Sequence, residues 1–571
     1  MNPRIQIFRI GVASCGVAAG AEEVRSRLEA ASSVPVIGVG CIGHCYAEPL
    51  VEAVLDDGTS VFYANVKPDE KQIANLLELG GEHRFSIPES RKSKELIKVL
   101  ALAGKVDPVD FDDYVRHGGY EGLKNALAMK PEEVVSEVKI SGLRGRGGGG
   151  FPTGNKWGFL AAKQVSEKVI VCNADEGDPG AFMDRALMES VPHQVLEGML
   201  IAAWATGGTK LFIYCRAEYP MAIKHVSAAI EQIYAHKLNV FPDRTVEIII
   251  KAGAGAFVCG EETALIASLE GLRGQPRFRP PFPTDSGYRG LPTMINNVET
   301  FGNVPLILRE GGAAFASVGT EGSKGTKIFA LAGDLKYPGL AEVPMGTTLK
   351  EIVFDIGGAD PAKVKAVQTG GPSGGCIPAE LFDTPVDYDS LRTLGAIMGS
   401  GGMIVVGADR CMVETARYFL DFTHRESCGK CTFCRVGTTR MFEILERITA
   451  GKGTEEDLAL LEELGPKVKA GSLCGLGQTA PNPVLATLRF YRKEYEEHVR
   501  EHRCRALQCN AFVDLFLDQS KCVKCKLCIR TCPTGAVGQD FVIDNSKCTR
   551  CNSCADVCPK KAISRVAKGT K

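Results

Sequence analysis

Long hydrophobic runs are missing from this sequence. No stretch reaches the ~18 consecutive apolar residues that a membrane-spanning helix needs, so we expect no insertion into a membrane. The N-terminal segment has Arg4 and Arg9 ahead of a run of small residues, but its apolar core is too short for a secretory signal peptide. We therefore expect a cytoplasmic protein.

An excess of charge of either sign is also missing. The 67 Lys and Arg residues nearly balance the 68 Asp and Glu residues, which leaves a formal net charge of −1. Without a global basic field, the chain is not expected to bind nucleic acid or acidic membrane surfaces. Its 571 residues suggest about three or four domains.

Cysteine, in contrast, is plentiful. There are 22 cysteines, and 14 of them follow residue 427. In a long chain without an export signal, so many thiols indicate metal binding or redox chemistry rather than disulfides. The spacing of the cysteines distinguishes these sites from one another.

The clearest spacing lies near the C-terminus, where the pattern C-x2-C-x2-C-x3-C-P occurs twice, 26 residues apart. This duplication resembles bacterial two-cluster ferredoxins, in which the fourth cysteine of each run ligates the other cluster. The resemblance implies two [4Fe–4S] clusters with crossed ligation. One would be held by Cys522, Cys525, Cys528 and Cys558, and the other by Cys548, Cys551, Cys554 and Cys532.

A third set of thiols begins with the pattern C-x2-C-x2-C. Cys428, Cys431 and Cys434 can cap three irons of a cubane, and the remote Cys474 can close it. A zinc site would more often show two separated pairs of ligands. We therefore predict a third [4Fe–4S] cluster at these residues.

Two further cysteines lie close to two histidines between these motifs. His498 and His502 precede Cys504 and Cys509. A structural zinc ion held by His498, Cys504 and Cys509 is one interpretation, although three ligands do not complete a tetrahedral site. Free surface thiols are the other, and the sequence leaves both open.

A glycine-rich loop organises the middle of the chain. Residues 142–157 read GLRGRGGGGFPTGNKW. Glycines such as Gly145 and Gly147 can present backbone N–H groups at close range to a phosphate or to the edge of a flavin ring, while Arg146 and Lys156 add positive charge. A flexible linker is the alternative, but linkers are typically rich in serine and do not interleave cations and aromatic residues so densely.

Two later segments place polar residues after apolar strands, where ligands commonly bind, and a third adds two side-chain amides able to donate and accept around a ring or ribose. Acidic residues beside a cationic loop can be simple charge balance. The recurrence of the pattern favours a ligand site instead. The residues concerned are Asn173, Asp175 and Glu176, then Gly260, Glu261 and Glu262, and finally Asn296 and Asn297.

The glycine loop and these three segments resemble, in the same order, the flavin- and NADH-binding subunit of respiratory complex I and its soluble relatives, over about residues 115–500. The resemblance implies FMN bound by Gly145, Gly147, Gly148, Lys156, Asn173, Asp175, Glu176, Gly260, Glu261, Asn296 and Asn297. It implies a nicotinamide dinucleotide bound across the flavin by Phe151, Phe159, Glu262, Arg279 and Phe282. Relatives mostly carry lysine at the position of Arg279, so the charge is kept.

A Rossmann fold is not expected from these glycines. Its G-x-G-x-x-G motif needs a preceding strand and a following helix. Pro152 and Gly154 argue against a helix directly after the loop.

Residues 1–80 resemble the thioredoxin-like [2Fe–2S] domain of NADH dehydrogenases, which uses two pairs of cysteines. Cys41 and Cys45 form the second pair, but Ile10 stands where Cys15 should have its partner. A strand at 5–12, a helix at 21–31 and a hairpin turning at 56–58 are expected.

The fourth ligand of such a cluster is therefore missing. His44 is adjacent to one ligand and would have to point back over the same iron, and the alcohol of Ser14 is a poor ligand beside thiolates. We predict a docking domain without a cluster, and about twelve irons per chain from three [4Fe–4S] clusters.

These observations together predict a multidomain α/β and α+β protein. The connector should carry helices at 92–102 and 120–129. The expected parts are a thioredoxin-like domain at 1–80, a connector at 81–130, an FMN- and NAD(H)-binding domain at 131–320, a ubiquitin-like (SLBB-type) domain at 321–407, a helical [4Fe–4S] domain at 408–500, a linker with the candidate zinc site at 501–514, and a two-[4Fe–4S] ferredoxin-like domain at 515–571.

The combination of sites indicates an electron-transfer flavoprotein. A nicotinamide exchanges two electrons as a hydride, iron–sulfur clusters accept one electron at a time, and a flavin does both. No general acid or nucleophile is needed, so no side chain is assigned a catalytic role.

The fused N-terminal and ferredoxin-like parts resemble those of the diaphorase (beta) subunit of cytoplasmic multimeric hydrogenases and formate dehydrogenases, including electron-bifurcating ones. That resemblance implies NAD(H) or NADP(H), companion subunits with the hydrogenase or formate site, a small [2Fe–2S] subunit and, for bifurcation, ferredoxin. An electron-wiring scaffold with an inactive flavin site is the alternative.

Overall fold

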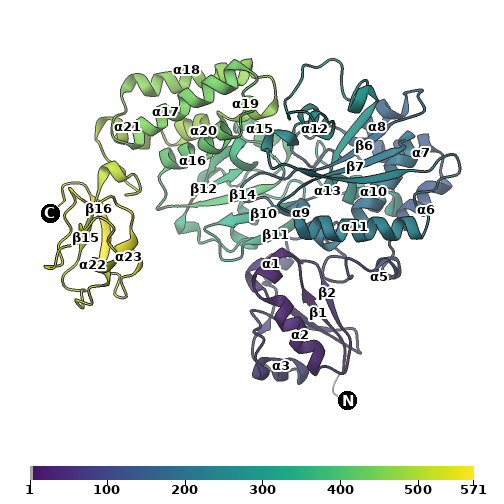
Figure 1. Ribbon diagram of the computed structural model, residues 1–571, viewed down its shortest axis with the longest axis horizontal. Coiled ribbons are helices and arrows are strands. Elements are labelled where there is room, and N and C mark those ends of the chain that lie inside the picture. The colour runs from purple at the N-terminus through teal and green to yellow at the C-terminus, as the bar shows by residue number, and fades with distance from the viewer. Residues whose placement is uncertain (1–3, 571) are drawn as a thin grey trace. The chain divides into compact units, whose positions relative to one another are not determined.

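Residues 4–570 are described by a computed structural model (Figure 1). The chain forms two compact units. The first comprises residues 1–406 with 473–475, and the second comprises 407–472 with 476–571.

The N-terminal part of the first unit is a mixed five-stranded sheet in the order β2-β1-β3-β4-β5. β1 pairs in parallel with β2 and antiparallel with β3. The expected strand, helix and hairpin are confirmed. The elements are β1 Ile5–Gly11, α1 Ser14–Ala18, α2 Ala21–Ala31, β2 Val36–Val39, β3 Val51–Leu55, β4 Ser60–Tyr63, α3 Glu70–Leu77 and β5 Arg84–Phe85.

The connector is less helical than expected. It contains α4 (Glu89–Lys92), α5 (Phe111–Arg116) and α6 (Glu121–Ala128). The helix predicted at 120–129 is confirmed, but the one at 92–102 is wrong. The carboxylate of Glu342 accepts hydrogen bonds of 2.9–3.0 Å from the backbone N–H groups of residues 98–100, which diverts them from a helical ladder.

A four-stranded parallel sheet in the order β8-β7-β6-β9 forms the centre of the first unit. Its helix α10 is buried over nearly all of its length, which explains why that segment is apolar on every face. The strands are β6 Val169–Ala174, β7 Lys210–Arg216, β8 Glu247–Gly253 and β9 Thr293–Asn297. The helices are α7 Pro131–Ile140, α8 Thr153–Ala161, α9 Met183–Ser190, α10 Pro192–Thr206, α11 Pro220–Ala235, α12 Glu262–Leu269, α13 Val298–Glu310 and α14 Gly312–Ala316.

The expectation of no helix directly after the glycine loop is wrong, because α8 begins right after Pro152. Proline is tolerated at the start of a helix, where its missing N–H has no partner to lose. Gly154 is required by packing, since a Cβ there would lie 2.7 Å from the backbone nitrogen of Lys139. A helix, α7, precedes the loop, so the Rossmann motif is still excluded.

A second five-stranded sheet in the first unit has the order β11-β10-β14-β12-β13. The segment that precedes β14 contacts the glycine loop: the Tyr388 hydroxyl donates to the Gly145 carbonyl at 2.8 Å, and Gly399 forms a bridge with Gly148. The elements are β10 Thr326–Gly333, β11 Gly339–Pro344, β12 Val364–Thr369, β13 Gly375–Pro378, α15 Tyr388–Thr393 and β14 Gly402–Gly407.

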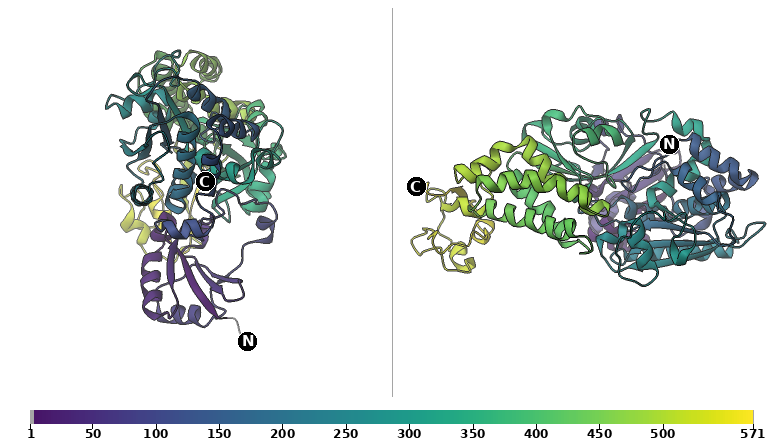
Figure 2. Two further views of the ribbon diagram at one scale, coloured as in Figure 1. Left: turned by 90° about the vertical axis from the view of Figure 1, so that its right-hand side faces the viewer. Right: turned by 90° about the horizontal axis from the view of Figure 1, so that it is seen from above.

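The second unit begins with helices that run alongside one another, drawn in green in Figure 2. A small domain with two antiparallel strands follows. The elements are α16 Met412–Arg425, α17 Thr438–Thr449, α18 Glu455–Gly471, α20 Asn482–Phe490, α21 Arg492–Arg500, β15 Val513–Leu517, α22 Leu527–Thr531, α23 Ser553–Asp556 and β16 Ile563–Ala567; α19 (Gly475–Thr479) begins in the first unit.

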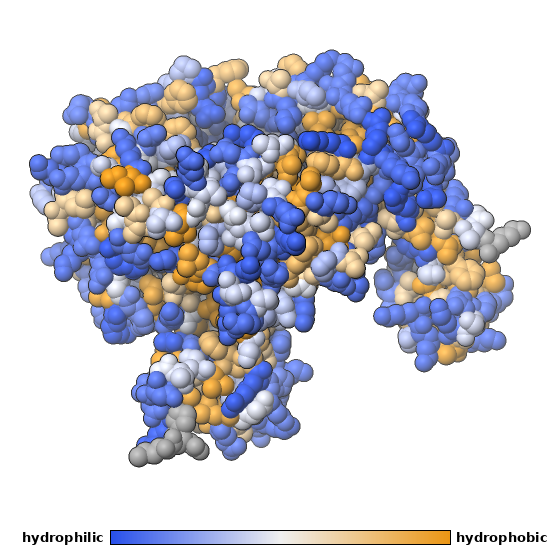
Figure 3. Space-filling model, turned by 180° about the vertical axis from the view of Figure 1, so that it is seen from behind, coloured by the Kyte–Doolittle hydropathy of each residue, from blue (hydrophilic) through white to orange (hydrophobic). Residues whose placement is uncertain are grey.

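Among residues 4–570, no helix is long and apolar enough to cross a membrane. Hydrophilic side chains cover much of the face seen in Figure 3, with hydrophobic ones interspersed between them.

Candidate functional site

A cavity of about 910 Å³ opens in the first unit beside the carboxyl ends of β6 and β9 and the start of α12. Such an edge of a parallel sheet is a common place for a ligand. The structure brings together most of the predicted cofactor residues here. Those that line the cavity are Gly145, Gly147, Phe151, Lys156, Phe159, Asn173, Gly260, Glu261, Glu262, Arg279, Phe282, Asn296 and Asn297.

Four predicted residues do not line the cavity: Arg146, Gly148, Asp175 and Glu176. Arg146 is fully buried, and its guanidinium donates to the carbonyls of Arg144 and Lys324 at 3.2 and 2.6 Å. The carboxylate of Glu176 accepts hydrogen bonds from the first turn of α9, at Asp184 and Arg185. These side chains support the wall of the cavity rather than face it.

Several lining residues carried no signal in the sequence. Gly475 is the most informative, because it directly follows Cys474, the predicted fourth ligand of a [4Fe–4S] cluster. The cavity wall is thereby one residue away from a predicted cluster ligand. Gly149 and Gly150 of the glycine loop also line the cavity, and the other unpredicted lining residues are Ala162, Lys163, Pro283, Thr284, Asp285, Thr293 and Ile295.

Lys156, Arg279 and Glu262 form one connected charged group in the cavity wall; the other charged lining residues are Glu261 and the pair Lys163–Asp285. Lys156 forms an ion pair with Glu262 and donates to the Ile295 carbonyl at 3.0 Å. Arg279 lies 3.5 Å from the other oxygen of Glu262. The six charged lining residues balance one another, so the positive charge that suits a phosphorylated ligand is local to Lys156 and Arg279.

The side chain of Glu261 is hydrogen-bonded to the protein backbone. Its carboxylate caps α12 by accepting from the backbone N–H groups of Thr263 and Ala264, both at 2.9 Å. This is the usual role of an acidic residue at a helix N-terminus. The side chain thus shapes the cavity mainly by defining where α12 begins.

The amide side chains in the cavity are held in fixed orientations. Trp157 donates to the Asn296 amide oxygen at 3.1 Å, and the Asn173 amide donates to the Gly260 carbonyl at 2.9 Å. Gly147 approaches Asn297 so closely that a Cβ at Gly147 would lie 2.9 Å from the Cβ of Asn297. The loop therefore needs glycine at this position.

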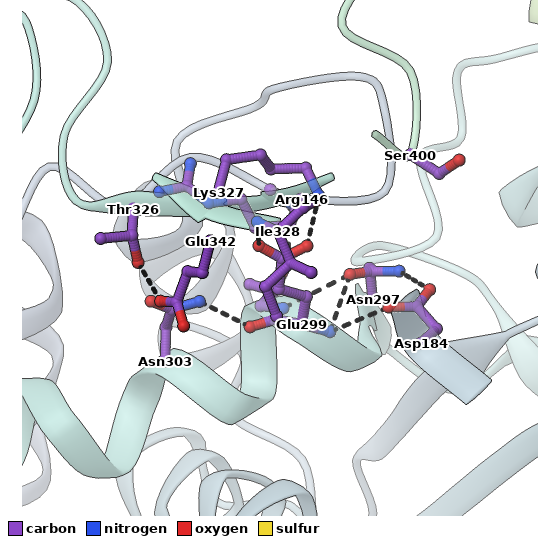
Figure 4. A network of polar contacts seen from close by, with 12 residues as sticks. Arg146, Asp184, Asn297, Glu299, Asn303, Thr326, Lys327, Ile328, Glu342 and Ser400 are labelled. Carbon is purple, nitrogen blue, oxygen red and sulfur yellow. Dashed lines mark hydrogen bonds and ion pairs between the residues drawn. The ribbon is translucent and has the colours of Figure 1, made fainter. Parts of the chain in front are cut away.

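A buried polar network lies behind Asn297 (Figure 4). The Asn297 amide donates to Asp184, and Lys327 forms a fully buried ion pair with Glu299. The Glu299 backbone N–H donates to Asn297 at 2.9 Å. Burial raises the pKa of Asp184, and the nearby carboxylates of Glu176 and Glu299 add to the shift. The network ties α13 to α9 and β10 behind the cavity.

Aromatic rings at the cavity remain exposed. Phe151 and Phe159 are 47% and 52% exposed, with ring centroids 6.3 Å apart, and Phe282 is 52% exposed. Open aromatic faces beside a cavity can stack on a flat heteroaromatic ring.

In the small C-terminal domain, the four cysteines of one predicted ligand set lie around one hollow. Cys522, Cys525, Cys528 and Cys558 line one small hollow, and Cys532 does not line it. In the helical domain, Cys434 lies against Gly477, where an added Cβ would be 2.9 Å from the Cβ of Cys434. Cys428 and Cys431 lie in the loop after α16, and Cys434 lies in the helical turn that follows this loop.

The candidate zinc residues converge with a fourth one that sequence reasoning missed, Cys411. All four side chains are buried, and their ligand atoms lie within 4.8 Å of one another. The His498 Nε2 atom lies 3.5 Å from Cys411 Sγ and 3.3 Å from Cys509 Sγ. Cys504 completes the group, and His502 is not part of it.

The other ring nitrogen of His498, Nδ1, fixes the orientation of the imidazole. Nδ1 lies 2.7 Å from the Glu494 carbonyl, so a proton on Nδ1 leaves the lone pair of Nε2 facing the sulfurs. Three thiolates and one imidazole are a donor set that fits tetrahedral zinc. Cys411 lies 87 residues before His498, so no spacing motif could reveal it.

Comparison with family models matches three parts of the chain. Residues 138–306 match the Nuo51 FMN-binding domain, and residues 414–498 match the NADH-ubiquinone oxidoreductase-F iron–sulfur binding region. Residues 515–537 and 541–564 match the 4Fe-4S binding domain.

Curated relatives and solved structures agree with these matches. The chain is 52% identical over 452 residues to the NADP-reducing hydrogenase subunit HndC of Solidesulfovibrio fructosivorans, covering 78% of this chain and 92% of that protein. It is 43% identical over 398 residues to an F-type subunit of the NADH-quinone oxidoreductase of Rhizobium meliloti (strain 1021), covering 68% of this chain and 94% of that protein.

Among solved structures, the H2-reduced NAD+-reducing [NiFe]-hydrogenase matches with a TM-score of 0.65 and 31% identity, over 88% of this chain and 85% of that one. The resemblance drawn from the glycine loop and its three companion segments is confirmed. The chain belongs to the family of flavin- and iron–sulfur-binding NAD(P)H oxidoreductase subunits that includes the F-type subunits of NADH-quinone oxidoreductases and the hydrogenase subunit HndC.

Proposed function

We propose that this chain is the diaphorase subunit of a multisubunit hydrogenase and passes electrons between a nicotinamide dinucleotide and its own iron–sulfur clusters by way of FMN. The observation that carries the proposal is the cavity whose wall contains both the glycine loop and Gly475, the neighbour of Cys474. A ligand in this cavity lies close to a cluster cysteine, as electron transfer requires.

The inner part of the cavity fits FMN. The oriented amides of Asn173, Asn296 and Asn297 can pair with a ring or ribose, and Gly145 and Gly147 let the ligand approach the backbone. When bound, the flavin exchanges two electrons with a nicotinamide and single electrons with clusters. Arg146 and Glu176 would support the FMN site indirectly, through their hydrogen bonds to the backbone of the cavity wall. Gly148 lies in the glycine loop and Asp175 directly after β6.

The outer part of the cavity fits a nicotinamide dinucleotide. Phe151, Phe159 and Phe282 offer exposed ring faces, and Lys156 and Arg279 offer positive charge around Glu262. We assign Glu262 to orienting the dinucleotide and its two cations, because its carboxylate is shared between them. None of these groups needs to move a proton for hydride transfer.

Electrons would leave through three [4Fe–4S] clusters held by the cysteines predicted above, the first of them at Cys428, Cys431, Cys434 and Cys474. We also assign one structural zinc ion to Cys411, His498, Cys504 and Cys509, whose buried donors fit it. Zinc has no redox chemistry, so this site would stabilise the fold between the helical and C-terminal domains.

The relatives favour a hydrogenase over a formate dehydrogenase as the partner complex. HndC is named as a subunit of an NADP-reducing hydrogenase, and the similar structure is a hydrogenase that reduces NAD+. Companion subunits would carry the hydrogen site and a small [2Fe–2S] centre. Proteomic identification of chains that copurify with the native complex tests this, and a formate dehydrogenase subunit among them would overturn the choice.

The electron-transfer role is tested on the isolated chain. We expect bound FMN by absorbance and rapid viologen reduction with NADH or NADPH, and the ratio of kcat/KM for the two dinucleotides identifies the physiological one. A chain without flavin and without this activity would instead support the scaffold alternative.

The division of roles is tested with two variants. Glu262→Gln should keep FMN but raise KM for the dinucleotide by about tenfold or more, since a charge-assisted hydrogen bond contributes about 1.5–3 kcal/mol. Gly147→Ala should lose FMN, because its Cβ would press on Asn297. Glu270→Gln, just after the last turn of α12, is the control. Loss of flavin in Glu262→Gln would show that the division is wrong.

A further inference from the structure

A second tight group of thiols lies in the N-terminal domain. Cys15 is in the first turn of α1, and Cys41 and Cys45 flank the loop after β2. Their three sulfur atoms lie within 4.8 Å of one another, and the sulfurs of Cys41 and Cys45 are 3.7 Å apart. Residues separated by up to 30 positions in the sequence therefore meet at one point.

The residues considered from sequence as a fourth ligand point elsewhere. Ile10 is packed in the apolar core of the domain. The Ser14 hydroxyl donates to the carboxylate of Glu189. The His44 ring packs against the rings of Tyr46 and Phe85. None of these three is positioned as a ligand.

Glu48 is an acidic residue that lies beside the group, at Cys15. It is only 7% exposed, and its Oε1 atom lies 3.8 Å from the sulfur of Cys15. The other oxygen accepts a 2.8 Å hydrogen bond from the backbone of Leu50, which fixes the carboxylate in place. Space for it depends on Gly11 and Gly16, where added Cβ atoms would lie 2.7 and 3.2 Å from its oxygens.

The spacing of the sulfurs fits one metal ion rather than a [2Fe–2S] cluster. Zinc–sulfur bonds of ~2.3 Å in a tetrahedron place neighbouring sulfurs about 3.8 Å apart. The distance of 3.7 Å between the sulfur atoms of Cys41 and Cys45 agrees with this sulfur–sulfur distance. Ligands on two different irons are held further apart, because both ions lie between them, and here all three sulfurs lie within 4.8 Å of one another.

We propose that Cys15, Cys41 and Cys45 bind a single zinc ion, with water as the fourth ligand and the carboxylate of Glu48 beside Cys15. Three protein ligands with water in the fourth position are an arrangement that zinc accepts. The backbone N–H of Gly43, 3.3 Å from Cys41 Sγ, can stabilise the thiolate charge. Because zinc does not change oxidation state, the site lies outside the electron pathway.

The site would fasten the N-terminal domain to the rest of the first unit. The Cys41 backbone N–H donates to the Ser190 hydroxyl at 3.1 Å, and Ser14 donates to Glu189 from both backbone and side chain. Leu340 donates to the Gly43 carbonyl at 3.0 Å. The ligand loops are thus the same loops that make the contact with α9 and β11.

The experiment measures zinc and iron in the full chain by mass spectrometry after anaerobic purification. We expect two zinc ions and about twelve irons per chain. Cys41→Ala should lose one zinc and no iron, Cys411→Ala should lose the other zinc, and the double variant should contain none. FMN content and viologen reduction are measured in parallel, so failure of the flavin assignment is seen separately.

A milder variant guards against misfolding. Glu48→Gln keeps all three thiols and should weaken zinc binding by at least about tenfold in competition with a chromogenic chelator. Glu52→Gln, on the neighbouring strand β3, is the matched control and should change nothing. Unchanged zinc in Cys41→Ala, a loss of two irons with a [2Fe–2S] signal, or a disulfide between Cys41 and Cys45 in place of metal would each overturn the proposal.

Discussion

The two ends of this chain use cysteine in opposite ways. The C-terminal domain contains two copies of one short motif, four of its cysteines line one hollow, and several of its cysteines are partly exposed. The N-terminal domain brings three unpatterned cysteines to one tight point. Among the described residues, only that group and the one at Cys411 have ligand atoms within 4.8 Å of one another. Separation of the sulfurs thus distinguishes room for a cluster from room for a single ion.

The largest expected effect concerns the crossed ligation in the C-terminal domain. In a chain with Cys548, Cys551 and Cys554 changed to serine, the second tail cluster is lost and about eight irons should remain. Adding Cys558→Ser should lower iron to about four, because Cys558 lines the hollow of the first cluster. Iron content and the electron paramagnetic resonance of the reduced protein are the measurements.

Cys532→Ser in the same triple-serine chain is the matched control. Since Cys532 is assigned to the second cluster, about eight irons should remain in this variant. The reverse pattern, with iron lost on Cys532→Ser and kept on Cys558→Ser, would mean that each run binds its own cluster. The crossed ligation would then be wrong.

The next effect concerns the tight group in the second unit. Cys411→Ala should remove one zinc ion and lower the thermal unfolding temperature clearly, because structural zinc contributes roughly 10–16 kcal/mol of binding free energy in small domains. Differential scanning calorimetry with metal analysis checks this. Cys376→Ala, a cysteine equally buried in β13, should shift the unfolding temperature far less and keep all metals. Equal shifts in the two variants, with zinc retained, would show that Cys411 is only a core residue.

The smallest effect concerns how the N-terminal end is held. Ser14→Ala removes the hydroxyl that donates to the buried carboxylate of Glu189, and should destabilise the contact by about 1–3 kcal/mol. Hydrogen exchange in α1 and α9 should rise, while zinc, iron and FMN stay unchanged. A loss of metal in this variant would mean that the domain contact and the three-cysteine group cannot be separated.

The cluster motifs and the order of the ligand segments could be predicted from sequence because they are local. A cubane motif places three ligands within seven residues, and a strand followed by polar residues brings them to one edge of the sheet. The family and most of the cavity lining followed from such patterns. The helix α8 did not, because its tolerance of Pro152 and its need for Gly154 depend on packing against α7.

The sequence by itself determined the kinds of chemistry this chain can support, since residue type and short spacing set which metals and cofactors can be bound. Only the tertiary structure decided which distant side chains complete a site. Cys411 joins His498 across 87 residues, and Glu48 reaches Cys15 because Gly11 and Gly16 leave room for its carboxylate. It also turned Arg146 and Glu176 away from the cavity to hold its walls. The physical reason is that buried polar groups need partners, and those partners are found through packing rather than along the chain.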